Sequence, residues 1–273
     1  MTATDRSLQL RPRLRGAEAI PILSALNLEG GALAMLSRID GRFYRPVGAI
    51  MAFLPGGRQI GQLSGGCIEG DLAIHAESLT AGDPAKTLRY GAGSPFVDIR
   101  LPCGSGIEVM LTPVPAGAFS DLLTTLAARR SAPLGLPGLP ALDILPRTRV
   151  ALFGEGAELT HFSRLAETAG FEISRPAHMA TPDLDPFTAA LLLFHDHHRE
   201  IAILRDALAS PAFWIGAQGS HTVHGRRLAE LRYQGIDPAQ LSRLRGPIGL
   251  IPDARDPVTL AISVLAEITA AQP

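Results

Sequence analysis

The second half of the sequence alternates short apolar runs with segments of helical periodicity, and this alternation limits the folds that it can adopt. Segments expected to be helices lie at Ala157–Ala169 and Glu200–Ala209, and a last one begins at Asp256. The runs expected to be strands are Val150–Phe153, Phe171–Ser174, Ala189–Phe194 and Phe213–Ile215. Strands that alternate with helices of this length are typical of parallel sheets with crossover helices. Residues 148–273 therefore predict a Rossmann-like, doubly wound parallel-sheet domain.

The first half has another order and predicts a separate, mixed α/β domain over residues 1–115. Two apolar strands, Gly31–Ile39 and Val47–Leu54, are joined through the turn dipeptide Asp40-Gly41. A strand at Arg58–Leu63 and an amphipathic helix at Cys67–Leu79 follow. Residues 116–147 are rich in proline and glycine, and we expect them to be a linker with a short helix, because these residues exclude long regular elements.

Charge and composition exclude several classes of partner. The chain of 273 residues carries 25 Lys and Arg against 26 Asp and Glu, so its net charge of -1 gives no general attraction for nucleic acid or anionic membranes. No apolar run approaches the roughly 20 residues that a membrane span needs. The N-terminus does not resemble a signal peptide, because arginines interrupt its apolar residues. We therefore expect a cytoplasmic protein whose two cysteines are free thiols.

The first cysteine stands in the segment Ser64-Gly65-Gly66-Cys67-Ile68-Glu69. At the start of the expected helix, Cys67 would feel the helix dipole, which lowers the pKa of a thiol and favours a nucleophilic or metal-binding thiolate. The alternative is a small buried apolar side chain, which is the usual role of a free cysteine.

The second cysteine, Cys103, lies in a stretch with too much glycine and proline to belong to a core. Its neighbour Gly104 and the surrounding backbone amides could form a nest for an anion. Together the two segments predict thiols beside backbone hydrogen-bond donors.

A partial nucleotide fingerprint follows the first strand of the second half. Gly154 and Gly156 stand between a strand and a helix, where glycine lets the backbone approach a phosphate. The third small residue of the fingerprint is replaced by Leu159, and Arg175 stands near the place of the ribose-binding acid. We therefore expect that NAD(P) does not bind, with nucleotide binding as the alternative.

Two histidine clusters are candidate metal or anion sites. His195, His197 and His198 follow a strand whose carboxyl end faces the expected ligand crevice, and we interpret them as a hydrogen-bonded wall, with a metal site as the alternative. His221 and His224 begin an arginine-rich stretch that we interpret as a solvated helix face. A surface for phosphate or an acidic partner is the alternative interpretation of that stretch.

Motifs in both halves occur in the order found in one known family. They read SGGCIEGD at 64–71, RLPCGSGIEV at 100–109, and then LFGEG, LLLFHDHHRE, WIGAQGS and GPIGL before the helix AISVLAEI. Over nearly its whole length the chain thus resembles the XdhC/CoxI family of xanthine dehydrogenase accessory factors. The resemblance implies that Cys67 and Cys103 are the family's motif cysteines.

The resemblance also implies a function. It implies a protein that binds the molybdenum cofactor as cargo, protects it during sulfuration, works with a cysteine desulfurase and passes it to an apo molybdenum hydroxylase of the xanthine dehydrogenase type. This cofactor is an anionic dithiolene with a terminal phosphate, which suits soft thiol ligands and backbone donors. The residues expected to bind it are Ser64, Gly65, Gly66, Cys67, Glu69, Cys103, Gly104, Gly154 and Gly156.

On this basis we expect a cofactor-insertion chaperone rather than an enzyme. An NAD(P)-dependent oxidoreductase is the first alternative, but it would need a ribose-binding acid after the second Rossmann strand. A sulfurtransferase that carries a persulfide on Cys67 is the second. The sequence leaves the client enzyme and the oligomeric state open, and it admits a homodimer.

Overall fold

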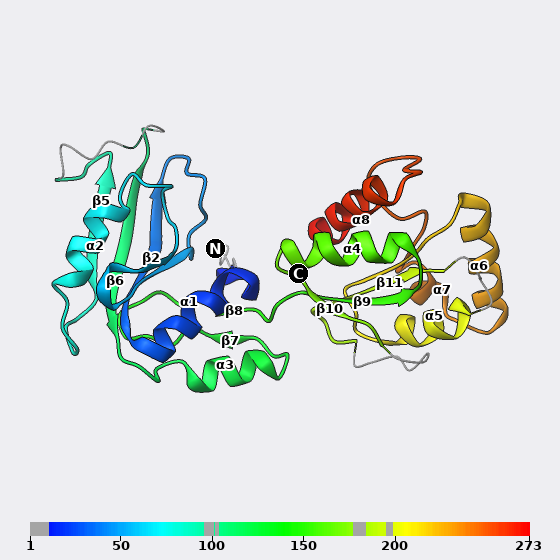
Figure 1. The fold of residues 1–273 in the computed structure, drawn as a ribbon, viewed down its shortest axis with the longest axis horizontal. Coiled ribbons are helices and arrows are strands. Elements are labelled where there is room, and N and C mark those ends of the chain that lie inside the picture. Colours follow the sequence, from blue (N-terminus) through cyan, green and yellow to red (C-terminus); the bar gives the residue numbers. More distant parts are fainter. Residues whose placement is uncertain (1–10, 96–100, 102–103, 177–183, 195–198) are drawn as a thin grey trace, which may run out of the picture. The chain divides into compact units, whose positions relative to one another are not determined.

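The computed structural model describes residues 11–95, 101, 104–176, 184–194 and 199–273. The chain divides into two compact units, Met1–Pro146 and Arg147–Pro273 (Figure 1). Each unit has its own sheets and its own buried apolar clusters.

A five-stranded antiparallel sheet forms the centre of the first unit. Its strand order is β4-β3-β2-β6-β5. The strands are β2 (Gly31–Asp40), β3 (Ile50–Phe53), β4 (Gln59–Gly61), β5 (Lys86–Gly91) and β6 (Gly106–Val114). The expected strands Gly31–Ile39 and Val47–Leu54 correspond to β2 and β3, whereas the expected strand Arg58–Leu63 is reduced to β4 after a short 3-10 turn, η1 (Pro55–Gly57).

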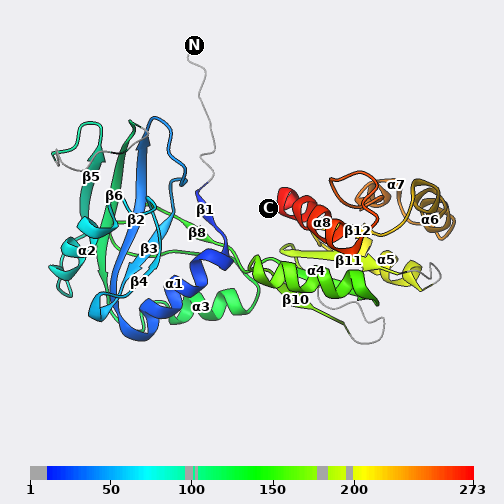
Figure 2. The ribbon, with the colours of Figure 1, turned by 45° about the horizontal axis from the view of Figure 1, so that its top comes forward.

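Both faces of this sheet are buried, because the side chains of β2 alternate between two apolar clusters. Leu33 and Met35 pack in the cluster that contains α1 (Gly16–Glu29). Ala34 and Leu36 pack in the cluster that contains Leu72 of α2 (Glu69–Glu77). The two helices therefore cover opposite faces of the sheet (Figure 2).

The segment 116–147, expected to be a linker, lies within the first unit in the structure. It forms α3 (Ser120–Ala127), β7 (Ala132–Pro133) and β8 (Asp143–Ile144), and β8 pairs with both β7 and β1 (Arg13–Leu14). The segment contributes Leu126, Leu134, Leu142 and Ile144 to the apolar cluster around α1. Its prolines and glycines limit the length of the elements, but the leucines between them are buried. The boundary between the units falls after Pro146 instead.

The second unit contains a five-stranded parallel sheet with the order β10-β9-β11-β12-β13. The strands are β9 (Arg149–Gly154), β10 (Glu172–Ser174), β11 (Thr188–Leu193), β12 (Trp214–Ala217) and β13 (Leu244–Arg245). The helices are α4 (Ala157–Thr168), α5 (Glu200–Ala209), α6 (His221–Tyr233), α7 (Pro238–Leu241) and α8 (Pro257–Ala271). The predicted Rossmann-like, doubly wound sheet is confirmed.

Helices cover both faces of the parallel sheet. Residues of α4 and α8 share one apolar cluster with the sheet, and residues of α5, α6 and α7 share the other. The last helix begins as predicted, because the Asp256 carboxylate accepts hydrogen bonds from the amides of Val258 and Thr259 at 3.1 and 2.8 Å. Among the described residues, no helix combines the length and the apolar character that a membrane span requires.

Candidate functional site

The connections that carry the two cysteine motifs lie toward one end of the sheet of the first unit. Strands β2, β4 and β5 end in that direction, and β3 and β6 begin there, because all neighbouring strands are antiparallel. The Tyr90 hydroxyl at the end of β5 donates to Asp71 in the first turn of α2 at 2.6 Å. The start of α2 therefore lies against the end of β5, where the second cysteine loop departs.

Glu69 anchors the loop that contains Cys67. Its carboxylate accepts hydrogen bonds from the amides of Leu63 at 2.9 Å and Ser64 at 2.6 Å through Oε1. Through Oε2 it accepts from the amides of Gly66 at 2.9 Å and Ile68 at 3.3 Å, and from the hydroxyl of Ser64. Glu69 is only 8% exposed. Although burial opposes the charge, these hydrogen bonds lower the pKa of Glu69 to about 2.

This cradle changes what the predicted binding residues can do. The amides of Ser64 and Gly66, expected to be free for a phosphate, already donate to the carboxylate of Glu69. In the described part of the chain, no acceptor receives a hydrogen bond from the amides of Gly65 and Cys67. The loop therefore holds its own anion inside and leaves those two donors for a ligand.

Cys67 is exposed. It precedes the helix by two residues, because α2 begins at Glu69 and not at Cys67 as the sequence analysis expected. The alternative of a buried apolar cysteine is therefore wrong. The expected effect of the helix dipole on its thiol stays a prediction.

The base of the second cysteine loop is held by an ion-pair network. Arg89 donates to Asp40 at 2.7 Å and to Glu108 at 3.0 Å, and thereby joins strands β5, β2 and β6. Gly104 donates to the carbonyl of Leu101 at 2.9 Å. Cys103 itself lies outside the described residues, so its expected position beside Cys67 stays a prediction.

Tyr44 is a candidate that the sequence analysis missed. It stands in the connection between β2 and β3, and its hydroxyl oxygen lies 3.5 Å from the point where a Cβ of Gly65 would be. Burial and the negative charges of Glu69 and Cys67 raise the pKa of the Tyr44 phenol. No local pattern marks this residue, because its closeness to Gly65 depends on how two separate connections fold.

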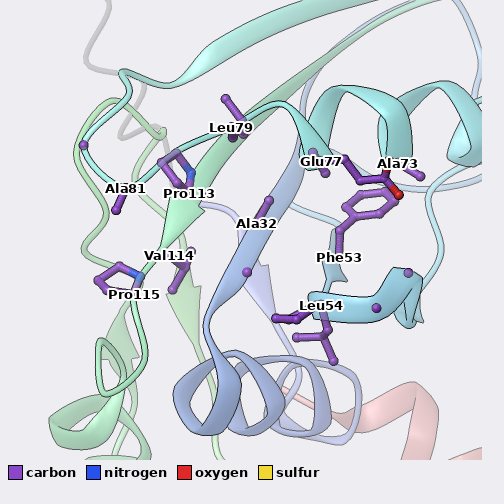
Figure 3. A pocket seen from close by; sticks show the side chains of 16 residues that line it. Ala32, Phe53, Leu54, Ala73, Glu77, Leu79, Ala81, Pro113, Val114 and Pro115 are labelled. Carbon is purple, nitrogen blue, oxygen red and sulfur yellow. The ribbon is translucent and has the colours of Figure 1, made fainter.

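A cavity of about 710 Å³ lies at the other end of the sheet (Figure 3). Gly31 at the start of β2, Phe53 at the end of β3 and Val114 at the end of β6 line it. Figure 3 shows Glu77 of α2 beside Phe53 on one side of this cavity. None of the expected cofactor-binding residues lines it.

In the second unit, Gly154 and Gly156 line a cavity of about 500 Å³ at the carboxyl ends of the strands. A side chain at Gly154 would place its Cβ 2.1 Å from the carbonyl oxygen of Leu193, so the close approach of β9 and β11 explains this glycine. Arg175 and Arg199 also line the cavity. Its positive side chains suit an anion, whereas the usual carboxylate for a ribose is replaced.

The histidine clusters give a divided result. His195, His197 and His198 lie outside the described residues, and within the described part of the chain no group of His, Cys, Asp and Glu could hold a metal ion. The stretch from His221 forms α6, as the helix interpretation predicted, but Arg227 is buried and donates to Glu200 at 2.8 Å. This arginine is therefore part of the core and not of a solvated face.

Comparisons with known proteins agree with the motifs. The XdhC Rossmann domain family matches residues 150–268, and the XdhC and CoxI family matches residues 27–91. The molybdenum cofactor insertion chaperone PaoD of Escherichia coli is 35% identical, over 88% of this chain and 83% of its own. The chain belongs to the XdhC and CoxI family.

Other relatives of this XdhC and CoxI family member extend over most of its length. A protein of Bacillus subtilis described as a probable xanthine dehydrogenase component is 24% identical, over 88% of this chain and 92% of its own. A crystal structure described as a xanthine dehydrogenase from Bacillus halodurans has a TM-score of 0.75 at 22% identity, with 94% of this chain and 96% of that chain covered. The latter comparison supports the fold.

Proposed function

We propose that this chain binds the molybdenum cofactor, protects it during sulfuration and inserts it into a molybdenum hydroxylase of the xanthine dehydrogenase type. The observation that carries the proposal is the exposed Cys67, held outside a loop that Glu69 anchors, in a chain that is 35% identical to an insertion chaperone. A carrier needs such a ligand on its surface, because the cargo must be taken up and released again.

The chemistry of the loop fits this cargo. The sulfur of Cys67 is a soft ligand, and the amides of Gly65 and Cys67 would donate to anionic oxygen atoms of the cofactor. No atom lies within 4 Å of a Cβ position at Gly66, so the backbone is open to a ligand there. Glu69 and Ser64 act from behind, since they hold the loop and do not face the cargo.

The remaining assignments belong to the same proposal. Cys103 would supply the second thiol, from a loop whose base Arg89 fixes to two neighbouring strands. Gly154 and Gly156 would approach an anionic group in a cavity that Arg175 and Arg199 make positive. A cysteine desulfurase as sulfur source, an apo hydroxylase as client, a homodimer and a cytoplasmic location complete it.

The two alternative functions are less well supported. For an NAD(P)-dependent oxidoreductase, Arg175 follows β10 near the place where a ribose-binding acid would stand. A persulfide sulfurtransferase shares the exposed Cys67 with the proposed chaperone, and only the bound species distinguishes the two.

The proposed function is tested by purifying the chain without oxygen from cells that make the cofactor. We expect wild-type protein to carry molybdenum and pterin, and to activate an apo hydroxylase when the two are mixed. Cys67→Ser should lose most of the bound molybdenum, because a hydroxyl is a poor substitute for a soft ligand. Glu77→Gln, an exposed change on α2 away from this loop, is the matched control and should behave as wild type.

Two outcomes would contradict the proposal. Wild-type protein without molybdenum or pterin, but with a stable persulfide on Cys67 in mass spectra, would favour the sulfurtransferase. A Cys67→Ser variant that retains the cofactor and activates the apo hydroxylase as wild type does would remove Cys67 from the site.

A further inference from the structure

An exposed aromatic ring stands beside the loop of Cys67. Tyr44 is 58% exposed, although its neighbour Phe43 packs against the buried cluster on the α2 face of the sheet. The two rings lie 5.2 Å apart and are tilted by 44°. Phe43 thus anchors the connection between β2 and β3, and Tyr44 is presented to solvent from a fixed base.

The hydroxyl end of Tyr44 points toward the candidate site. Its oxygen lies 3.5 Å from the Cβ position of Gly65, a residue whose φ of 72° favours glycine. The charges of Glu69 and Cys67 act on this phenol, so the hydroxyl lies within electrostatic reach of both. Their negative charge keeps the phenol protonated, and it is therefore a hydrogen-bond donor next to the free amides of Gly65 and Cys67.

We propose that Tyr44 is a positioning residue that binds the flat pterin part of the cargo while Cys67 holds its metal end. This inference rests on the proposed function and adds a residue to the same site. An aromatic ring next to a thiol offers a face for stacking to a planar heterocycle, and its hydroxyl offers a donor to the polar edge of that heterocycle. A lone exposed tyrosine elsewhere on the surface would have neither neighbour.

The chain supplies a matched control for the test. Tyr233, at the end of α6 in the second unit, is 88% exposed. We compare Tyr44→Ala, Tyr44→Phe and Tyr233→Ala by titration with molybdenum cofactor released without oxygen from a purified molybdenum hydroxylase. The readouts are the dissociation constant and the quenching of pterin fluorescence, which reports stacking and not the stability of the fold.

We expect Tyr44→Ala to weaken binding about tenfold or more, because stacking of a heterocycle on an aromatic side chain is worth roughly 1–3 kcal/mol. The fluorescence quenching should disappear in this variant. Tyr44→Phe keeps the ring, so it should keep the quenching and lose only a few-fold in affinity. Tyr233→Ala should bind as wild type does.

The failure of this inference differs from the failure of the proposed function. If Cys67→Ser weakens binding while Tyr44→Ala binds and quenches as wild type does, Tyr44 has no role and the proposed function stands. If wild-type protein does not bind the released cofactor, the proposed function is overturned and the role of Tyr44 with it. Equal losses in Tyr44→Phe and Tyr44→Ala would overturn the stacking role.

Discussion

Replacement of Glu69 by glutamine measures how much of the Cys67 loop depends on one buried carboxylate. Oε1 of Glu69 accepts from two backbone amides, and Oε2 accepts from two further amides and a hydroxyl. Whichever oxygen becomes the NH2 group of a glutamine, that group faces at least two N–H donors. The substitution therefore leaves buried donors unsatisfied and brings donors into contact.

The size of the effect follows from the pKa of Glu69. A pKa of about 2 in the folded chain, against an ordinary value of 4.5, corresponds to roughly 3 kcal/mol at about 1.4 kcal/mol for each pH unit. Because the folded-state pKa is the lower one, this stabilisation is complete above pH 4.5. It is lost as the pH falls through 4.5 toward 2, and less than half of it is left at pH 3.

The assay combines urea unfolding with amide hydrogen exchange. At pH 7 we expect Glu69→Gln to lower the free energy of unfolding of the first unit by roughly 3 kcal/mol, and the difference from wild type to shrink by more than half at pH 3. Exchange should become faster at the amides that Glu69 holds, such as Ser64 and Gly66. Glu77→Gln on the same helix is the control, and the fluorescence of Trp214, the single tryptophan, follows the second unit separately.

An unchanged pH dependence in Glu69→Gln would refute the reasoning, because the carboxylate would then contribute no pH-dependent stability. Unchanged exchange at the loop amides would refute the cradle itself.

Two further predictions concern the second unit. Arg227→Leu leaves the carboxylate of Glu200, 1% exposed, without its arginine, so we expect a loss of about 3–5 kcal/mol in unfolding followed by Trp214 fluorescence. The exposed neighbour variant Arg226→Leu should change stability little, and equal losses in both would contradict this role. Addition of NAD or NADP at 100 times a typical dissociation constant would stabilise a binder by about 2.7 kcal/mol, and we expect no rise in melting temperature. A clear rise with either nucleotide would bring the oxidoreductase forward.

The sequence by itself determined the second unit well. Strands β9 and β11 are continuous apolar runs, and α4, α5 and α8 have helical periodicity with recognisable ends. Such patterns arise within a few neighbouring residues, so they can be read before the chain is folded. The exposed motif cysteine Cys67 was found in the same way, from a short glycine-rich segment.

Contacts between distant residues were decided only by the tertiary structure. The prolines and glycines of 116–147 predicted a linker, yet the leucines among them are buried, because a partner surface at α1 is present in the fold. The occupation of the loop amides by Glu69 depends on how the backbone turns back on itself, and residue types alone do not show it. Tyr44 reaches Gly65 from another connection, since pairing of β2, β3 and β4 brings both to one end of the sheet. Local patterns predict elements, whereas strand pairing across long separations places the groups that form a site.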